Sequence, residues 1–156
     1  RIWLCHVPSD SLSSSIQSVS DIPPLIATSV VRGSEQGQSH GGVFIIDPAS
    51  QAVSQVIDWD TADIDWSGRG WDRGLRGIAF HNGEVYFAAS DELFVYDQQV
   101  RVQRSFRNAY LKHCHEICVY DGKLYLTSTG YDSILAFDLT AQEQYRTVTI
   151  AISPEQ

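Results

Sequence analysis

The four consecutive residues His113, Cys114, His115 and Glu116 are the densest group of reactive side chains in the sequence. On an extended strand, alternate side chains point to the same side, so His113 and His115 would face one way and Glu116 the other. Two such imidazoles could bind a divalent metal ion, although a complete site needs at least three ligands. The segment therefore predicts a metal site at His113 and His115, a ligand or anion site, or a hydrogen-bonded structural network.

A second group of candidates lies in the segment 59–75, where three tryptophans accompany two arginines. Aromatic rings and guanidinium groups together can form the wall of a site for a sugar or a carboxylated ligand. Packing of the tryptophans over the edge of a sheet is the alternative interpretation. The candidate ligand contacts in this segment are Trp66, Arg69 and Trp71.

Four aspartates between residues 58 and 65 suggest a calcium site at first sight. Their spacing lacks the central glycine and the closing glutamate of the hand-type calcium loop. An exposed acidic loop is therefore favoured over a metal site at this point of the chain.

The elements that must position these residues are indicated by an internal repeat. Residues 75–87 align without a gap with residues 114–126, so that Gly83 and Gly122 lie 39 residues apart. In this register His115 takes the position of Arg76, and Glu116 takes that of Gly77. A repeat of this length is typical of proteins built from similar supersecondary units, and it gives neighbouring units polar side chains at the same place.

Each repeat is predicted to form four short antiparallel strands. Apolar residues alternate along the segments, and the dipeptides Asn82-Gly83 and Asp121-Gly122 favour the positive φ angles of a two-residue hairpin turn. Four antiparallel strands in about 40 residues are the size of one propeller blade. The sequence thus predicts an all-β protein, a single unit over residues 1–156 with about three blades: blade 1 at 1–59, a loop at 60–75, blade 2 at 76–107 and blade 3 at 113–152.

The repeated pattern consists of a Gly-Ile pair, apolar alternation, a turn glycine, an aromatic strand and a closing apolar-Asp pair. It resembles blades of the six-bladed propellers grouped with gluconolactonases and NHL repeats. The stretch from Asn108 to Asp138 is also similar to uncharacterised bacterial propeller proteins. This resemblance implies that a ligand or a metal ion binds at the mouth of the central channel, near Arg76, His115 and Glu116.

Long loops are expected at the same mouth. In a four-stranded blade, the connection into the first strand and the connection between the second and third strands lie on one face of the ring. The long segments 32–41, 59–75 and 128–133 occupy these places, and loops on a rigid scaffold commonly carry binding residues. The last of them adds Tyr131 and Asp132 to the candidate ligand contacts.

Three blades cannot close a ring, because an open end would expose the apolar face of a blade. Two copies could pair about a two-fold axis, so that each chain forms half of a six-bladed ring. Alternatively, the chain is one half of a longer protein, which the absence of methionine and the first residue, Arg1, would fit. We expect the homodimer ahead of the fragment.

Composition excludes several classes of partner. A net charge of −8 argues against nucleic acid, which needs a basic surface. No apolar run approaches the roughly 20 residues of a membrane-spanning helix. Cys5, Cys114 and Cys118 are expected to be buried free thiols rather than a disulfide, which favours a reducing compartment such as the cytoplasm.

Two functions remain after these exclusions. The first is a binding module that recognises a small ligand or a protein partner at the channel mouth. The second is a metal-dependent hydrolase or lactonase like the gluconolactonase group, in which a divalent ion polarises a carbonyl group. The repeats lack an obvious carboxylate ligand in each blade, and the presence of Glu116 as a single carboxylate does not match that group's pattern. Binding is therefore the first expectation.

Overall fold

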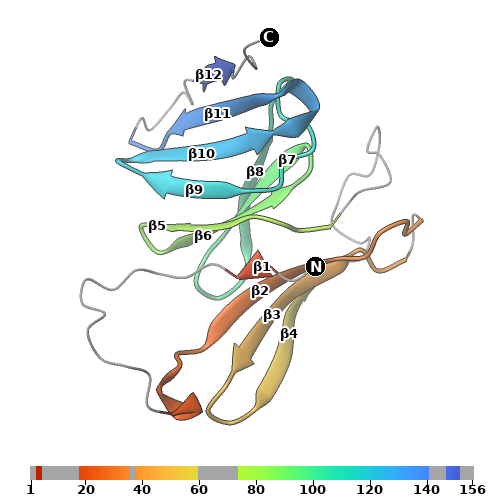
Figure 1. Ribbon diagram of the computed structural model, residues 1–156, viewed down its shortest axis with the longest axis vertical. Coiled ribbons are helices and arrows are strands. Elements are labelled where there is room, and N and C mark those ends of the chain that lie inside the picture. Colours follow the sequence, from red (N-terminus) through yellow and green to blue (C-terminus); the bar gives the residue numbers. More distant parts are fainter. Residues whose placement is uncertain (1–2, 5–17, 36–37, 60–73, 141–146, 152–156) are drawn as a thin grey trace.

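The computed structural model describes residues 3–4, 18–35, 38–59, 74–140 and 147–151. Over these residues the chain forms β-strands and two single-turn 3-10 helices, without any α-helix. The strands make three antiparallel sheets of four strands each, which lie one above another along the longest axis (Figure 1). The prediction of an all-β protein with about three blades is confirmed. The described residues contain no helix that is long and apolar enough to cross a membrane.

Each sheet takes its strands in chain order. The first sheet, blade 1, contains β1 (Trp3–Leu4), β2 (Leu25–Val30), β3 (Gly41–Asp47) and β4 (Ala52–Asp58), with η1 (Val19–Asp21) before β2. The second sheet, blade 2, contains β5 (Ile78–His81), β6 (Glu84–Ala89), β7 (Glu92–Tyr96) and β8 (Val102–Arg107). The third sheet, blade 3, contains β9 (Ile117–Tyr120), β10 (Lys123–Ser128), η2 (Thr129–Tyr131), β11 (Ser133–Asp138) and β12 (Thr147–Ala151).

The hairpin turns have the backbone conformation that their sequences predicted. Asn82 and Gly83 have φ angles of 47° and 78°, and Asp121 and Gly122 have φ angles of 48° and 67°. Positive φ at both central residues matches the twist of the flanking strands, so the two turns fix the register of β5 on β6 and of β9 on β10.

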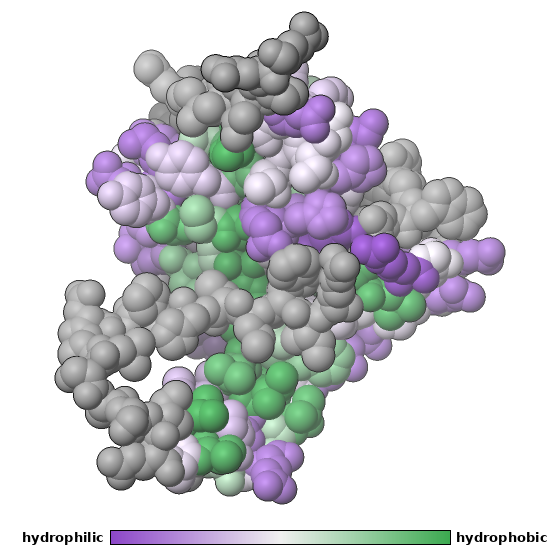
Figure 2. Space-filling view, viewed as in Figure 1, coloured by the Kyte–Doolittle hydropathy of each residue, from purple (hydrophilic) through white to green (hydrophobic). Residues whose placement is uncertain are grey.

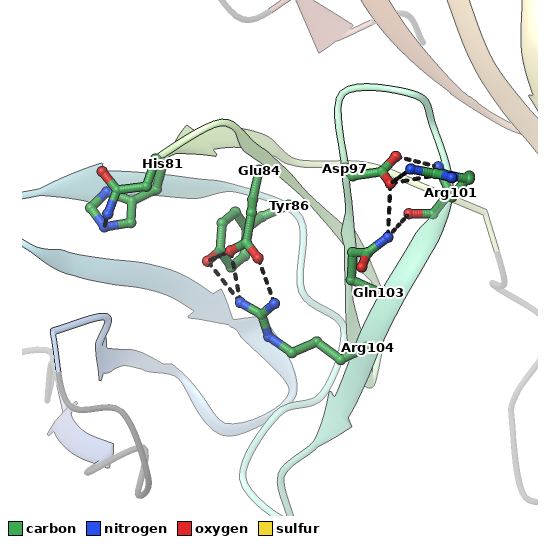
Figure 3. Close-up of polar contacts among 8 residues, drawn as sticks. His81, Glu84, Tyr86, Asp97, Arg101, Gln103 and Arg104 are labelled. Atoms are coloured by element: carbon green, nitrogen blue, oxygen red, sulfur yellow. Dashed lines mark hydrogen bonds and ion pairs between the residues drawn. The ribbon is translucent and has the colours of Figure 1, made fainter.

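The aspartate that closes each repeat has a structural role in all three sheets. The carboxylates of Asp47, Asp97 and Asp138 each accept a hydrogen bond from the backbone N–H two residues further on, at 2.9 to 3.0 Å. Asp97 also accepts from the backbone and side chain of Arg101 and from Gln103 (Figure 3). These bonds, led by the backbone N–H of Arg101, lower the pKa of Asp97. The repeated aspartate therefore forms the turn after the third strand.

Blade 2 is apolar on both faces because it packs between the other two blades. Toward blade 3 it contributes Ala79, Tyr86, Ala88, Leu93 and Val95, which meet Ile117, Leu124, Leu126, Leu135 and Phe137. Toward blade 1 it contributes Ile78, Phe87, Ala89, Phe94 and Tyr96, which meet Val43, Trp59 and the partly buried Ile26 and Ile57. Alternate residues of one strand thus belong to two different cores.

Candidate functional site at the channel mouth

Arg76 and His115, which the repeat register made equivalent, are in direct contact. A terminal guanidinium nitrogen of Arg76 lies 2.6 Å from Nε2 and 3.0 Å from Nδ1 of His115. Arg76 is buried, with 2% of its surface exposed, whereas His115 is half-buried. The backbone carbonyl of Arg76 accepts a hydrogen bond of 2.5 Å from the hydroxyl of Thr28 in β2. Arg76 therefore joins all three blades at one point.

Gly77 allows blades 2 and 3 to approach closely beside this contact. A Cβ atom at Gly77 would lie 2.8 Å from the backbone nitrogen of Ile117 and 3.0 Å from the carbonyl oxygen of His115. The backbone that leads into β5 thus lies directly against the backbone that leads into β9, which leaves room only for a residue without a side chain. This approach positions His115 next to Arg76.

Thr127 holds the candidate residues of blade 3, and the sequence analysis did not identify it. Its hydroxyl accepts from the backbone N–H of His115 at 3.2 Å and of Glu116 at 3.0 Å. In blade 2 the equivalent N–H, that of Arg76, donates instead to the carbonyl of Ala88 at 2.8 Å. The signal available was the replacement of an apolar repeat position, Ala88, by a threonine.

The segment 108–116 is fastened to the segment 127–131 along one edge of blade 3. The Ser128 hydroxyl donates to the carbonyl of Tyr110 at 2.6 Å and accepts from the N–H of Lys112 at 3.0 Å. The Thr129 hydroxyl donates to the carbonyl of His113 at 2.8 Å. The loop into the first strand and the loop after the second strand therefore lie together.

The expectation that His113 to Glu116 form the start of a strand is wrong. Strand β9 begins only at Ile117, and His113 has a φ angle of 55°, in the left-handed region. Only Cys114 makes a bridge, to Ser90 of blade 2. Since the backbone turns at His113, alternation along a strand does not place this side chain on the same side as His115.

Burial raises the pKa of both Cys114 and Glu116. Cys114 is fully buried, and burial raises the pKa of its thiol to about 12, which makes it unreactive. Burial also raises the pKa of Glu116, although its side chain remains exposed enough to meet solvent. The prediction of a buried free thiol is confirmed for Cys114 and wrong for Cys118, which is free but exposed in β9, while Cys5 lies outside the described residues.

Tyr131 and Asp132 lie at the outer part of the same edge. The ring of Tyr131 is exposed and packs edge-on against Tyr110, with 6.2 Å between ring centroids. Asp132 follows with a φ angle of 46° and caps η2 in the left-handed conformation. The structure thus brings one further aromatic residue, Tyr110, to a loop where the sequence had indicated only Tyr131.

The tryptophan-rich candidates divide into two groups. Trp66, Arg69 and Trp71 lie in the segment 60–73, outside the described residues. Trp59 precedes that segment, is buried, and packs edge-on against Phe94 at 4.7 Å between ring centroids. For Trp59, packing against a sheet is therefore the correct interpretation.

A metal site gains no third ligand from the part of the chain that the structure describes. No group of three or more His, Cys, Asp or Glu side chains gathers there in a way that could hold a metal ion. The two imidazoles at His113 and His115 remain the whole of the predicted ligand set.

The fold is that of β-propeller blades. No protein-family model and no curated protein sequence matches the chain. Among solved structures it is similar to Sqt1 of Saccharomyces cerevisiae, with a TM-score of 0.55 and 11% identity over 83% of this chain and 31% of that one. A chain of a nidogen/laminin complex gives a TM-score of 0.57 and 13% identity over 83% of this chain and 43% of that one.

A third similar structure comes from a mitotic checkpoint complex. It has a TM-score of 0.54 and 10% identity over 98% of this chain and 41% of that one. These three structures are propellers, and at such low identity the likeness concerns the fold. The chain spans less than half the length of each.

Proposed function

We propose that this chain is a propeller binding module whose mouth site, formed by His115 and Glu116 on the support of Arg76, recognises a small polar ligand or a polar group of a protein partner. Tyr131 and Asp132 would form the outer wall of this site. Trp66, Arg69 and Trp71, which lie outside the described residues, stay proposed as further ligand contacts.

The contact between Arg76 and His115 is the observation that carries this proposal. A guanidinium group has only donors, so the imidazole nitrogen that it contacts must act as an acceptor. Both ring nitrogens of His115 lie within 3.0 Å of the same guanidinium nitrogen, so the imidazole is held by Arg76. This pair would bind an anionic group, and the exposed carboxylate of Glu116 would accept a hydrogen bond from a hydroxyl group. Ligands with a hydroxyl group next to a carboxylate match these two contacts.

The proposal includes a complete ring. Residues 1–156 would act as one propeller unit with the blade boundaries given above, and two copies would close six blades around a common channel. The free thiols at Cys114 and Cys118 favour the cytoplasm as its compartment.

The metal-dependent hydrolase stays the second candidate, without a structural observation in its favour. A divalent ion at His113 and His115 would polarise a carbonyl group, but the described residues supply no third ligand. Metal analysis by mass spectrometry, together with an assay of glucono-δ-lactone hydrolysis, addresses this candidate directly.

Binding of D-gluconate, a ligand with adjacent hydroxyl and carboxylate groups, tests the first candidate. We expect gluconate to perturb the nuclear magnetic resonance spectrum of the wild type and of the His81→Ala control, but not that of His115→Ala. A purely structural role for His115 gives another result: the substitution lowers stability by about 1 to 3 kcal/mol and changes no binding. Retention of gluconate binding in His115→Ala would refute the proposed site.

A further inference from the structure

Within the described residues, blades 1 and 3 each have one sheet face against which no other blade packs, although Ala27 and Ala136 on these faces are themselves buried. On blade 1 this face, called here the rear face, carries Leu25, Ala27, Phe44 and Ile46. These residues alternate along β2 and β3 with residues such as Ile26 and Val43, which pack toward blade 2. On blade 3 the front face carries Cys118, Tyr125, Ile134 and Ala136 by the same alternation. Apolar surface gathers over blade 1 in the lower part of Figure 2.

The rear face of blade 1 matches, position by position, the face of blade 2 that is buried against blade 1. The repeat register and the strand pairing place Phe44 at the position of Phe94, and Ile46 at that of Tyr96. In blade 2 these positions are 6% and 5% exposed, whereas Phe44 and Ile46 are only half-buried. The rear face therefore has the pattern of a blade interface without the covering blade.

The front face of blade 3 matches the opposite face of blade 2 in the same way. Tyr125 takes the position of Tyr86, and Ile134 takes that of Leu93. Tyr86 is 1% exposed and Leu93 is fully buried against blade 3, whereas Tyr125 and Ile134 are half-buried. Cys118, at the position of the buried Ala79, is exposed.

We propose that the front face of blade 3 binds the rear face of blade 1 of a second copy of this chain. The interface would repeat the internal packing of blade 2 on blade 3, with Ile134 and Tyr125 against Phe44 and Ile46. This inference rests on the ring-closing part of the proposed function and adds the residues that close the ring.

A second copy fits because each chain carries one face of each kind. Two copies related by a two-fold axis form two identical interfaces, front on rear and rear on front, and leave neither face uncovered. The internal interfaces already show the required geometry, because a front face and a rear face of the same pattern pack together in them. A blade from elsewhere in a longer polypeptide is the competing occupant, and the mass in solution distinguishes it.

The repeat also defines where the interface ends. Val53, on the outermost strand of blade 1, pairs with Ile46 and corresponds to Val102 of blade 2. Val102 stays 54% exposed although blade 2 is covered on both sides, and Val53 is 65% exposed. Val53 is thus an apolar residue on the same sheet that should lie outside the contact, which makes it a matched control.

Complementary charges on the two faces give a specific test. We expect light scattering to give twice the chain mass for the wild type and for Val53→Asp, and the single chain mass for Phe44→Asp and for Ile134→Lys. An equimolar mixture of the two single-mass variants should recover the double mass. In the mixed dimer one interface joins the introduced aspartate to the introduced lysine, and the other interface has the wild-type residues on both faces. Circular dichroism verifies that each variant is folded.

Labelling of Cys118 supplies a second measurement that needs no interface variant. Thiol modification located by peptide mass spectrometry should be slowed at least tenfold in the wild type at high protein concentration, and should reach the free rate on dilution or in Phe44→Asp. A wild type with the single chain mass, Cys118 labelling independent of concentration, or folded variants that fail to recover the double mass on mixing would each overturn the proposal. Gluconate binding is measured separately on the single-mass and the double-mass proteins. An absence of gluconate binding would therefore refute the proposed ligand site without affecting the conclusion drawn from the mass.

Discussion

Arg76 and His115 occupy the same position in successive repeats, 39 residues apart, and yet their side chains touch at 2.6 Å. Equivalent residues of a repeat normally lie one blade apart. Contact between them therefore shows that the backbone segments leading into the first strands of blades 2 and 3 converge at this point. Gly77 permits the convergence, because a Cβ atom there would meet the next blade at 2.8 Å.

The energetic coupling of this pair can be measured by a double-mutant cycle. We expect Arg76→Met and His115→Ala to show an interaction free energy of about 1 to 2 kcal/mol in urea unfolding, because each removes the same charge-assisted contact. The effects of Arg76→Met and of His81→Ala, at the end of β5 next to the hairpin turn, should be additive. Additivity of the first pair would show that the contact contributes nothing to stability.

Much of the fold could be predicted because its determinants are local. The turn dipeptides at Asn82 and Asp121 specify positive φ. Apolar side chains on both faces of a strand indicate a sheet that is packed on two sides. The repeat register also predicted that Arg76 and His115 would share a site. These features depend on short stretches of sequence and on the repeat itself.

The rest of the site depends on contacts that no local pattern encodes. The hydroxyl of Thr127 accepts from the backbone N–H groups of His115 and Glu116, whereas in blade 2 the N–H of Arg76 donates to the carbonyl of Ala88. The same loop turns at His113, so alternation failed there. The role of Trp59 in the core was ambiguous because a tryptophan beside a loop suits either a binding wall or a packed edge.

Substitution of Gly77 tests the close approach of blades 2 and 3. Gly77→Ala should destabilise the protein by about 1 to 3 kcal/mol, because the methyl group would push against the backbone of Ile117 rather than against a movable side chain. Gly33→Ala, where a Cβ atom meets nothing within 4 Å but φ is 74°, should cost only about 1 kcal/mol of backbone strain. Equal costs in chemical denaturation would contradict the close approach.

The thiol of Cys114 should be inert in the folded protein. With a pKa of about 12 and no exposed surface, it has almost no thiolate at pH 8, so an alkylating reagent should leave it unmodified. Unfolding in urea should restore the ordinary reaction rate. In the Phe44→Asp variant, exposed Cys118 serves as the internal reference, and comparable labelling of both residues in that folded variant would disprove the burial of Cys114.

The ion pair between Glu84 and Arg104 gives a prediction for the dependence of stability on pH. Arg104 contacts both carboxylate oxygens of Glu84, at 2.5 and 2.7 Å, and the Tyr86 hydroxyl donates to the same carboxylate at 2.7 Å (Figure 3). The bonds from Arg104 are the largest cause of the lowered pKa of Glu84. A lowered pKa in the folded state stabilises the protein above the unfolded value of 4.5, and this contribution is lost as the pH falls through the folded value.

Arg104→Ala should therefore reduce the free energy of unfolding at pH 7 by about 1 kcal/mol or less, since the pair is partly exposed to solvent. The difference from the wild type should shrink steadily as the pH is lowered below 4.5, because protonated Glu84 no longer attracts the guanidinium group. In a Glu84→Gln background, Arg104→Ala should have an effect that does not change with pH. Urea unfolding between pH 3 and pH 7 measures all four proteins, and a wild-type difference that grows toward acid would show that the pKa of Glu84 is shifted in the opposite direction.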